Sequence, residues 1–222
     1  MELRIVLVRP RDPNNIGACA RAMANFGVRE LWVVAPHPPV WREAKSAVGA
    51  VDLLAGAREA AAVSEAVRGC RTIWATSSLT GRRPSIATID LPLEARPPGP
   101  AALLFGPEKT GLNADDLAHA SAILRIPTGA DCPSMNLAAA VAVACYAWTR
   151  EAPPPARGGP APATARLRER LWLELRRFAS QAGWQAGERT RRLKAAVYRS
   201  NVSDGEAGML LELGRRLMKR CS

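Results

Sequence analysis

Short apolar segments alternate with helix-like segments over the first 150 residues of this chain. The first apolar segment, Leu3–Val8, is continuous and rich in β-branched residues, as in a strand buried on both faces of a parallel sheet. Four further apolar runs predict strands over residues 31–34, 72–76, 101–105 and 122–126. Apolar residues at helical spacing predict helices over residues 16–26, most of 42–68, and 136–148. This alternation predicts an α/β domain built on a mostly parallel sheet.

A proline-rich stretch separates the α/β pattern from a purely helical one. Residues 153–163 read PPPARGGPAPA, a composition that cannot continue a helix and that suits a semi-rigid linker. Beyond it, Ser203 and Glu206 predict a capping box for the last helix. The residues expected to face inward from these helices are Leu167, Leu171, Leu175, Phe178, Leu210, Leu213 and Leu217. We therefore predict an α/β domain over 1–152, a linker over 153–163 and a small all-α C-terminal extension over 164–222.

The charge of the chain is strongly positive and unevenly placed. The 222 residues carry 31 Lys and Arg against 20 Asp and Glu, a formal net charge of +11. Residues 1–150 hold 16 basic and 13 acidic side chains, whereas residues 151–222 hold 15 and 7. A basic surface of this kind indicates a polyanionic partner such as nucleic acid. A solvated basic helical face without any partner explains the same composition.

Composition also bears on location and on metal or disulfide sites. No apolar run reaches the roughly 20 residues that cross a bilayer, and the first residues lack the basic-then-apolar order of a signal peptide. We therefore expect a soluble cytoplasmic protein with no membrane partner. The five cysteines form no Cys-x-x-Cys pair and the chain has two histidines, so neither a metal site nor a disulfide framework is expected.

Three polar clusters follow predicted strands, where open α/β sheets bind their ligands. The first lies in the sequence NNIGACARAM, residues 14–23. Asn15 stands where a helix N-cap is expected, and Gly17 permits a close approach to the backbone. Arg21 falls on the face of the helix opposite Ile16. A plain cap and a solvent-exposed arginine explain this cluster, taken alone, at least as well.

The second and third clusters are loops between a strand and a helix. Residues 104–112 read LFGPEKTGL, whose glycine spacing matches neither a Walker A loop nor G-x-G-x-x-G, so a phosphate cradle is not predicted. Residues 126–137 read IPTGADCPSMNL, and Ser134 or Asn136 is expected to open the next helix. Backbone groups here, with Met135 and Leu137 as apolar walls, suit a planar heterocycle. Each loop taken alone is equally well explained as an ordinary turn.

Together the three clusters resemble the motifs of a known enzyme family. N-x-G-x-x-A-R-A, L-x-F-G-x-E-x-x-G-L and I-P-(x)n-S-x-N-L-A-x-A-V occur here in this order. They resemble the SpoU/TrmH family of the SPOUT superfamily, whose members are RNA ribose 2′-O-methyltransferases. This resemblance covers residues 3–150. The basic segment between Glu188 and Arg216 resembles the C-terminal extension of the TrmJ-type tRNA methyltransferases.

The resemblance implies a fold, a cofactor and a set of site residues. In the family, a mostly parallel SPOUT-type sheet carries a C-terminal trefoil knot whose loops bind S-adenosylmethionine. Family members are homodimers with the active site at the subunit interface. The implied cofactor-binding residues are Thr76, Ser77, Ser78, Gly106, Ile126, Pro133, Ser134 and Met135. The implied catalytic residues are Asn15, Arg21, Glu108, Ser134 and Asn136.

The implied reaction moves a methyl group from a sulfonium to a ribose 2′-OH of tRNA, at nucleotide 32 in the anticodon loop. Arg21 is expected to stabilise the developing alkoxide and a neighbouring phosphate, because an arginine keeps its charge. Glu108 is expected to orient Asn15 and Arg21. TrmJ-type enzymes commonly carry basic residues just after a Thr-Ser pair. In this chain the pair is Thr76-Ser77, and the basic residues Arg82 and Arg83 follow it at a shifted position. The expected RNA-binding residues are Arg82, Arg83, Arg191, Arg192 and Lys194.

Other functions stay open on these residues. The same chemistry on ribosomal RNA, or at another tRNA position, fits the same motifs. A catalytically silent RNA-binding module is disfavoured by the retained polar residues. A Rossmann dinucleotide enzyme is disfavoured by the missing G-x-G-x-x-G.

Overall fold

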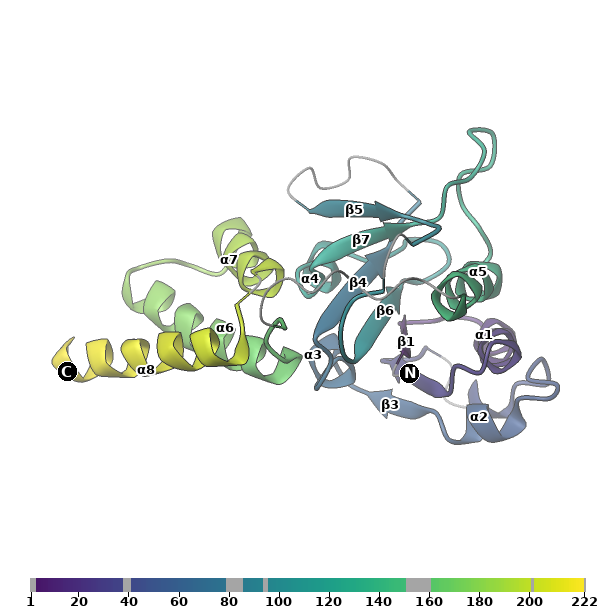
Figure 1. Ribbon diagram of the computed structural model, residues 1–222, viewed down its shortest axis with the longest axis horizontal. Coiled ribbons are helices and arrows are strands. Elements are labelled where there is room, and N and C mark those ends of the chain that lie inside the picture. The colour runs from purple at the N-terminus through teal and green to yellow at the C-terminus, as the bar shows by residue number, and fades with distance from the viewer. Residues whose placement is uncertain are drawn as a thin grey trace.

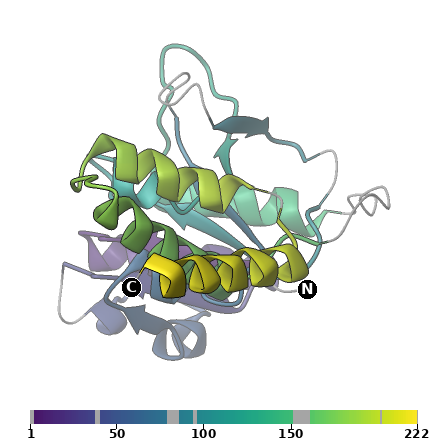
Figure 2. The ribbon, with the colours of Figure 1, turned by 90° about the vertical axis from the view of Figure 1, so that its left-hand side faces the viewer.

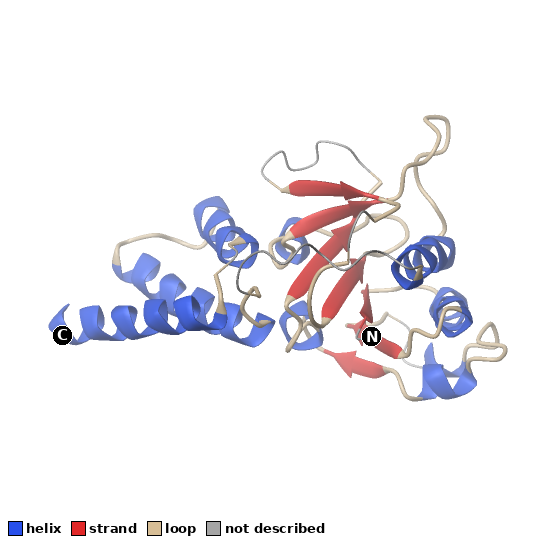
Figure 3. Cartoon of the chain, in the orientation of Figure 1, coloured by secondary structure: helices blue, strands red, loops and turns tan. Residues whose placement is uncertain are grey.

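A seven-stranded sheet, in which all paired neighbours run parallel, forms the centre of the protein (Figures 1 and 3). The computed structural model describes residues 3–37, 41–78, 86–93, 96–150, 161–200 and 202–221. The strand order is β3-β2-β1-β6-β4-β7-β5. The strands are β1 (Leu3–Val8), β2 (Glu30–Val34), β3 (Arg58–Ala60), β4 (Thr72–Thr76), β5 (Ala87–Asp90), β6 (Ala101–Phe105) and β7 (Ala122–Arg125). The prediction of an α/β fold with a mostly parallel sheet is confirmed.

The two strands at the edges of the sheet, β3 and β5, were not predicted. Both are short, and their residues are mostly exposed, so neither carries an apolar run. An edge strand is paired on one side and covered less, which removes the pattern that identifies a buried strand. Edge strands of this kind are recognised by their pairing and not by their sequence.

Helices cover both faces of the sheet. The side chains of β1 alternate: Ile5 and Leu7 pack with α1 (Pro13–Asn25), α2 (Val51–Ala55) and α5 (Leu137–Thr149), whereas Val6 and Val8 face α3 (Val63–Ala66) and α4 (Ala114–Leu117). This alternation is the period of two expected for a strand buried on both sides. Two apolar layers therefore hold the sheet between them.

The long helical stretch predicted over residues 42–68 was wrong. The structure has there a short 3-10 helix η1 (Trp41–Glu43), then α2, β3 and α3. Gly49 adopts a φ of +74°, which ends any helix before α2, and Gly56 forms the C-cap of α2. Alanine-rich composition favours helix, but glycines at these places break it into short pieces.

The start of α1 also differs from the prediction. Asp12, and not Asn15, is the N-cap: its side chain accepts a hydrogen bond of 2.8 Å from the backbone N–H of Asn14, and Pro13 is the first helical residue. Proline suits this place because the first N–H of a helix has no partner within the helix. Asn15 thus lies inside the first turn, and its side chain is free for other contacts.

The three helices after residue 160 pack on one another (Figure 2). They are α6 (Ala165–Gln181), α7 (Glu188–Arg199) and α8 (Asp204–Cys221), and the predicted Ser203–Glu206 capping box is present at α8. The predicted inner face of α8 was wrong, since Leu210 and Leu213 are 45% and 55% exposed. The buried side chains of α8 are instead Ala207 and Leu211. The side chain of Leu217 lies outside the described residues.

The face that α8 turns toward α6 is determined by the size of its side chains. A Cβ atom added at Gly214 would lie 2.9 Å from the ring of Phe178 on α6. Ala207, Leu211 and Gly214 therefore form a face with small residues at two of its three positions, which lets the two helices approach closely. A leucine stripe on the same helix gives the stronger apolar signal in the sequence, although it is the exposed one.

Buried polar contacts join the three helices to the sheet domain. Arg168 on α6 is 1% exposed and donates hydrogen bonds to the backbone oxygens of Tyr198 (2.9 Å) and Arg71. Arg71 in turn binds the carbonyl of Pro162 at 2.7 Å and the carboxylate of Asp204 at 3.1 Å. Residues 161–163, the last of the predicted linker, thus belong to the packed structure, while residues 153–160 lie outside the described part.

Within the described residues, no helix is long and apolar enough to span a bilayer, and no cluster of three His, Cys, Asp or Glu side chains could hold a metal ion. Cys19, Cys70 and Cys145 are buried thiols, whereas Cys132 is exposed. Burial raises the pKa of the Cys145 thiol to about 12, so this side chain stays protonated at neutral pH.

His119, between α4 and β7, lies buried under α7. Its Nε2 atom is 2.9 Å from Nζ of Lys194, and its ring packs edge-on against Tyr198 with 4.9 Å between centroids. Burial lowers the pKa of His119 to about 3, and the positive charge of Lys194 adds to the effect. The folded protein therefore holds this imidazole neutral.

This burial predicts an acid-sensitive component of stability. The unfolded chain binds a proton at His119 below about pH 6.5 and the folded chain does not, so the unfolding free energy falls as the pH drops below this value. Between about pH 7 and about pH 5.5 the loss from this group is about 1 kcal/mol. Denaturant titrations of H119Q should lack this component. The H37Q variant, which changes the other histidine, should keep it; equal pH dependence in H119Q and the wild type would contradict the prediction.

Candidate active site

A cavity of about 320 Å³ opens at the carboxyl ends of three adjacent strands, β6, β4 and β7. Loops after these strands form its walls, as expected for a ligand site in an open α/β sheet. All eight residues implied as cofactor-binding line it: Thr76, Ser77, Ser78, Gly106, Ile126, Pro133, Ser134 and Met135. Its volume lies at the lower end of the range of about 300–1,000 Å³ usual for small-molecule sites.

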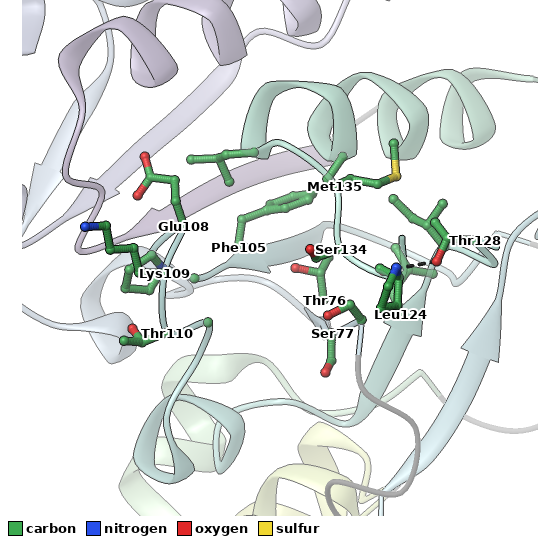
Figure 4. Close-up of a pocket in the computed structure, with 18 residues that line it drawn as sticks. Thr76, Ser77, Phe105, Glu108, Lys109, Thr110, Leu124, Thr128, Ser134 and Met135 are labelled. Atoms are coloured by element: carbon green, nitrogen blue, oxygen red, sulfur yellow. Dashed lines mark hydrogen bonds between the residues drawn. The ribbon is translucent and has the colours of Figure 1, made fainter. Parts of the chain in front are cut away.

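Figure 4 shows how side chains surround this cavity. Glu108 and Lys109 lie on one side and Met135 and Thr128 on the opposite side, with Thr76, Ser77 and Ser134 between them. Hydrogen bonds fix the first of the three loops, which follows β4, to the two strands that neighbour β4. The Thr76 hydroxyl donates to the carbonyl of Leu104 at 2.9 Å, and the Ser77 N–H donates to the carbonyl of Leu124 at 3.4 Å.

The second loop folds back tightly on its own first residue. A Cβ atom added at Gly106 would lie 2.3 Å from the backbone nitrogen of Leu112 and 2.4 Å from the carbonyl carbon of Gly111. The N–H of Gly111 donates to the carbonyl of Pro107 at 2.8 Å, and its φ is +64°. This backbone contact leaves no room for a side chain at Gly106, so glycine is required there.

The third loop is long, exposed and internally bonded. It joins β7 to α5 and extends beyond the sheet in Figure 1. The hydroxyl of Thr128 donates to the carbonyl of Pro133 at 3.0 Å, which closes the loop on itself. Asn136 is the N-cap of α5, because its side-chain oxygen accepts from the N–H groups of Ala138 and Ala139. One of the two predicted start residues of this helix is thereby confirmed.

Three of the implied catalytic residues form a hydrogen-bonded chain beside the cavity. The Asn15 amide donates to the carboxylate of Glu108 at 2.7 Å. The Asn136 amide donates to the side-chain oxygen of Asn15 at 3.5 Å. The chain links the first turn of α1, the β6 loop and the start of α5. These contacts join segments that are up to 121 residues apart.

Arg21 is placed differently from the other implied catalytic residues. It is exposed on α1, opposite the buried Ile16 and Met23 as predicted, and it does not line the cavity of its own chain. In the described part of the structure no hydrogen bond or ion pair joins Arg21 to another side chain. Ser134 lines the cavity, so four of the five residues gather at this edge of the sheet and Arg21 lies apart.

Leu137, expected as an apolar wall, lines the cavity, whereas sequence reasoning missed other lining residues: Phe105, Pro107, Lys109, Thr110, Gly111, Leu124, Thr128 and Ala140. Most of them lie inside the two loops at residues 104–112 and 126–137. The sequence therefore indicated the loops that form the cavity, but not each residue that lines it. Among the described lining residues there is no His or Cys. The cavity therefore offers backbone groups, serine and threonine hydroxyls, the carboxylate of Glu108 and the ammonium group of Lys109.

The expected RNA-binding residues fall into three groups. Arg191 and Lys194 line a second cavity, formed by α6, α7 and α4. Arg192 lies outside it and forms an ion pair of 3.2 Å with Glu188. Arg82 and Arg83 lie outside the described residues.

Comparisons with known proteins give a consistent set of relatives. Residues 2–146 match the model of the SpoU rRNA Methylase family. The chain is 39% identical over 153 residues to the tRNA (cytidine/uridine/adenosine-2′-O-)-methyltransferase TrmJ of Pseudomonas aeruginosa (strain UCBPP-PA14). That match covers 65% of this chain and 59% of the relative, so the chain matches about three fifths of the length of that protein.

Solved structures extend the likeness to the helical part. The crystal structure of TrmJ from Z. mobilis ZM4 superposes with a TM-score of 0.87 at 30% identity, covering 98% of this chain and 100% of that chain. An AdoMet-bound rRNA methyltransferase from Sinorhizobium meliloti superposes with a TM-score of 0.55 at 26% identity, covering 67% of this chain and 56% of that chain. From the match of the family model over residues 2–146, we conclude that the chain belongs to the SpoU rRNA methylase family.

Proposed function

We propose that this protein is an S-adenosylmethionine-dependent methyltransferase that acts in the cytoplasm on a ribose 2′-OH of tRNA, at nucleotide 32 in the anticodon loop. The observation that carries the proposal is the convergence of all eight implied cofactor positions, from three separate loops, on one cavity. The likeness to relatives named as tRNA 2′-O-methyltransferases supports tRNA as the substrate.

The cavity fits the cofactor chemically. Leu124, Ile126 and Met135 offer apolar contacts to an adenine ring, while the backbone around Gly106 and Ser134 can bind polar groups. When bound, S-adenosylmethionine supplies a methyl group activated by a positively charged sulfur. The AdoMet-bound relative supports this choice. We further propose that the loops after β6 and β7 belong to the trefoil knot of the family.

The protein's own residues then position the ribose and stabilise charge. The guanidinium group of Arg21 can stabilise the 2′-alkoxide as it forms and hold a neighbouring phosphate. It lies outside the cavity of its own chain, and we therefore place it in the site of a second copy within a homodimer. Glu108 and Asn15 fix the start of α1, and with it the direction in which Arg21 points.

One experiment distinguishes the proposed function from two alternatives. The first is methylation of ribosomal RNA, which the name of the family and the Sinorhizobium meliloti relative favour. The second is a silent RNA-binding module. We expect that deleting the gene and mapping 2′-O-methylation on total RNA will remove the mark at nucleotide 32 of a tRNA set. Loss of a ribosomal mark, or no loss at all, would refute the proposal.

Arg21→Ala should lower the methyl-transfer rate by about 10²–10³-fold, because it removes a donor that binds developing charge. Cofactor affinity, measured by calorimetry, should change little, because the proposed contacts of Arg21 are with the ribose and a phosphate of the RNA and not with the cofactor. Arg29→Ala removes the same charge from an exposed position outside α1 and serves as the matched control. Full activity of R21A would remove Arg21 from the mechanism.

Gly106→Ala should abolish cofactor binding. Its Cβ would lie 2.3 Å from the backbone nitrogen of Leu112, so the loop that lines the cavity must move. Calorimetric titration with S-adenosylmethionine measures the loss. The matched control is Gly129→Ala, in the neighbouring loop, where a Cβ atom meets nothing within 4 Å. Unchanged binding by G106A would show that this loop does not form the site.

The shared active site can be tested by mixing these two inactive variants. Random reassociation of R21A and G106A chains gives about half mixed dimers, each with one complete site, so about a quarter of the wild-type activity should return. No recovery after verified subunit exchange would place Arg21 and the cavity of the same chain together and contradict the interface site.

A further inference from the structure

A second cavity, of about 630 Å³, lies at one end of the helical part, where the end of α6 and the start of α7 meet α4. Figure 2 looks onto the three helices that form this part of the molecule. Two tryptophans, Trp172 and Trp184, and three cationic side chains line the cavity. The mechanism proposed above uses none of them.

Trp184 has an exposed side chain on a hydrogen-bonded backbone. The end of α6 forms a Schellman motif, in which the N–H of Trp184 donates to the carbonyl of Ala179 at 2.8 Å and the N–H of Gly183 donates to that of Ser180 at 3.0 Å. Gly183 supplies the positive φ of +81° that the motif needs. Trp184 nevertheless remains 42% exposed. An exposed indole whose backbone is held in place presents a flat apolar surface to a ligand.

Positive charge surrounds this aromatic surface. Arg176, Arg191 and Lys194 line the cavity against one carboxylate, that of Asp115. Lys194 is anchored, since its Nζ lies 2.9 Å from His119 and 6.0 Å from the centre of the Trp172 ring. Burial lowers the pKa of Lys194, and Arg176 lowers it further, whereas Glu169 and Asp115 act in the opposite direction. The lining thus carries an excess of cations over carboxylates.

The cavity lies close to the proposed active site along the chain. Gly111 lines the first cavity and Asp115, four residues later, lines the second. Their Cα atoms are therefore at most about 14 Å apart, because a fully extended chain spans at most about 3.6 Å per residue. At a rise of about 3.4 Å per stacked nucleotide, about four nucleotides cover that distance. A short single strand of RNA is therefore long enough to span the distance between these two lining residues.

From these features we propose that the second cavity binds an unpaired nucleotide of the RNA substrate, with the base stacked on Trp184 and the phosphate held by Arg176 and Arg191. Exposed aromatic faces bordered by cations are a usual means of binding single-stranded nucleic acid. The proposal rests on the proposed function, because it assigns part of the same RNA substrate to a second place on the protein.

Substitution of the aromatic surface tests the proposal on the full-length chain. We expect Trp184→Ala to raise the Kd for unmodified tRNA about tenfold, because base stacking contributes strongly to such binding. Trp184→Phe keeps an aromatic face and should restore most of the affinity. Leu173→Ala, a 48% exposed position of α6 outside the cavity, is the matched control and should leave the Kd unchanged.

A second pair of variants tests the proposed contact between Arg176 and a phosphate. Arg176→Gln should lower the slope of log K against log salt by about one, as expected for one lost phosphate contact. Arg177→Gln removes a charge from the next residue of α6, which lies outside the cavity, and should leave the slope unchanged. Equal slopes for R176Q and the wild type would overturn the phosphate assignment.

The outcomes separate this inference from the proposed function. Calorimetry with S-adenosylmethionine should give the same affinity for W184A as for the wild type, and failure of the wild type to bind it would count against the function alone. If the wild type methylates tRNA but W184A binds tRNA as tightly as L173A, the nucleotide site is wrong. Titration with cytidine monophosphate forms a further arm. If W184A loses binding of the mononucleotide but keeps the tRNA affinity of the wild type, the cavity binds a free nucleotide instead.

Discussion

The backbone contact between Gly106 and the Gly111–Leu112 peptide is the constraint on which both cavities depend. It folds the loop after β6 back on itself, so that Glu108 reaches Asn15 on α1. The same fold sends the chain directly into α4, whose N-cap is Asn113. Asp115 then borders the second cavity, and His119 supports Lys194 of α7. One tight turn thus sets the positions of the loop that lines the first cavity and of the surface that receives the helical part.

The sequence predicted the strands that are buried and the loops that follow them. Leu3–Val8 and residues 101–105 could be recognised because both faces of these strands are covered, which leaves a continuous apolar run. The loops could be recognised because glycine, proline and polar residues break that run. Strand order could not be predicted, since β6 lies between β1 and β4 although it follows both in the chain. That order places the three loops side by side.

The contacts that the sequence did not predict join residues that are distant in the chain. Lys194 lies against His119, 75 positions earlier, and neither side chain has a local pattern that indicates the other. The exposed stripe of Leu210 and Leu213 was taken as the inner face of α8 because leucine gives the stronger apolar signal. The true inner face uses Ala207 and Gly214, whose small size matters only beside Phe178. Size complementarity of this kind has no signature in one sequence.

Fewer of the positive charges of the helical part are available to bind phosphate than its composition suggests. Arg168 is fully buried and binds backbone carbonyls at the junction, so it cannot meet RNA. Arg191 and Arg192 share Glu188, and Arg215 and Arg216 share Glu212, at distances of 3.0 to 3.4 Å. Exposed pairs of this type contribute little to stability, and their arginines can exchange a carboxylate for a phosphate. Arg176, which lines the second cavity, forms no such pair in the described structure, so it can bind a phosphate without first giving up a carboxylate partner.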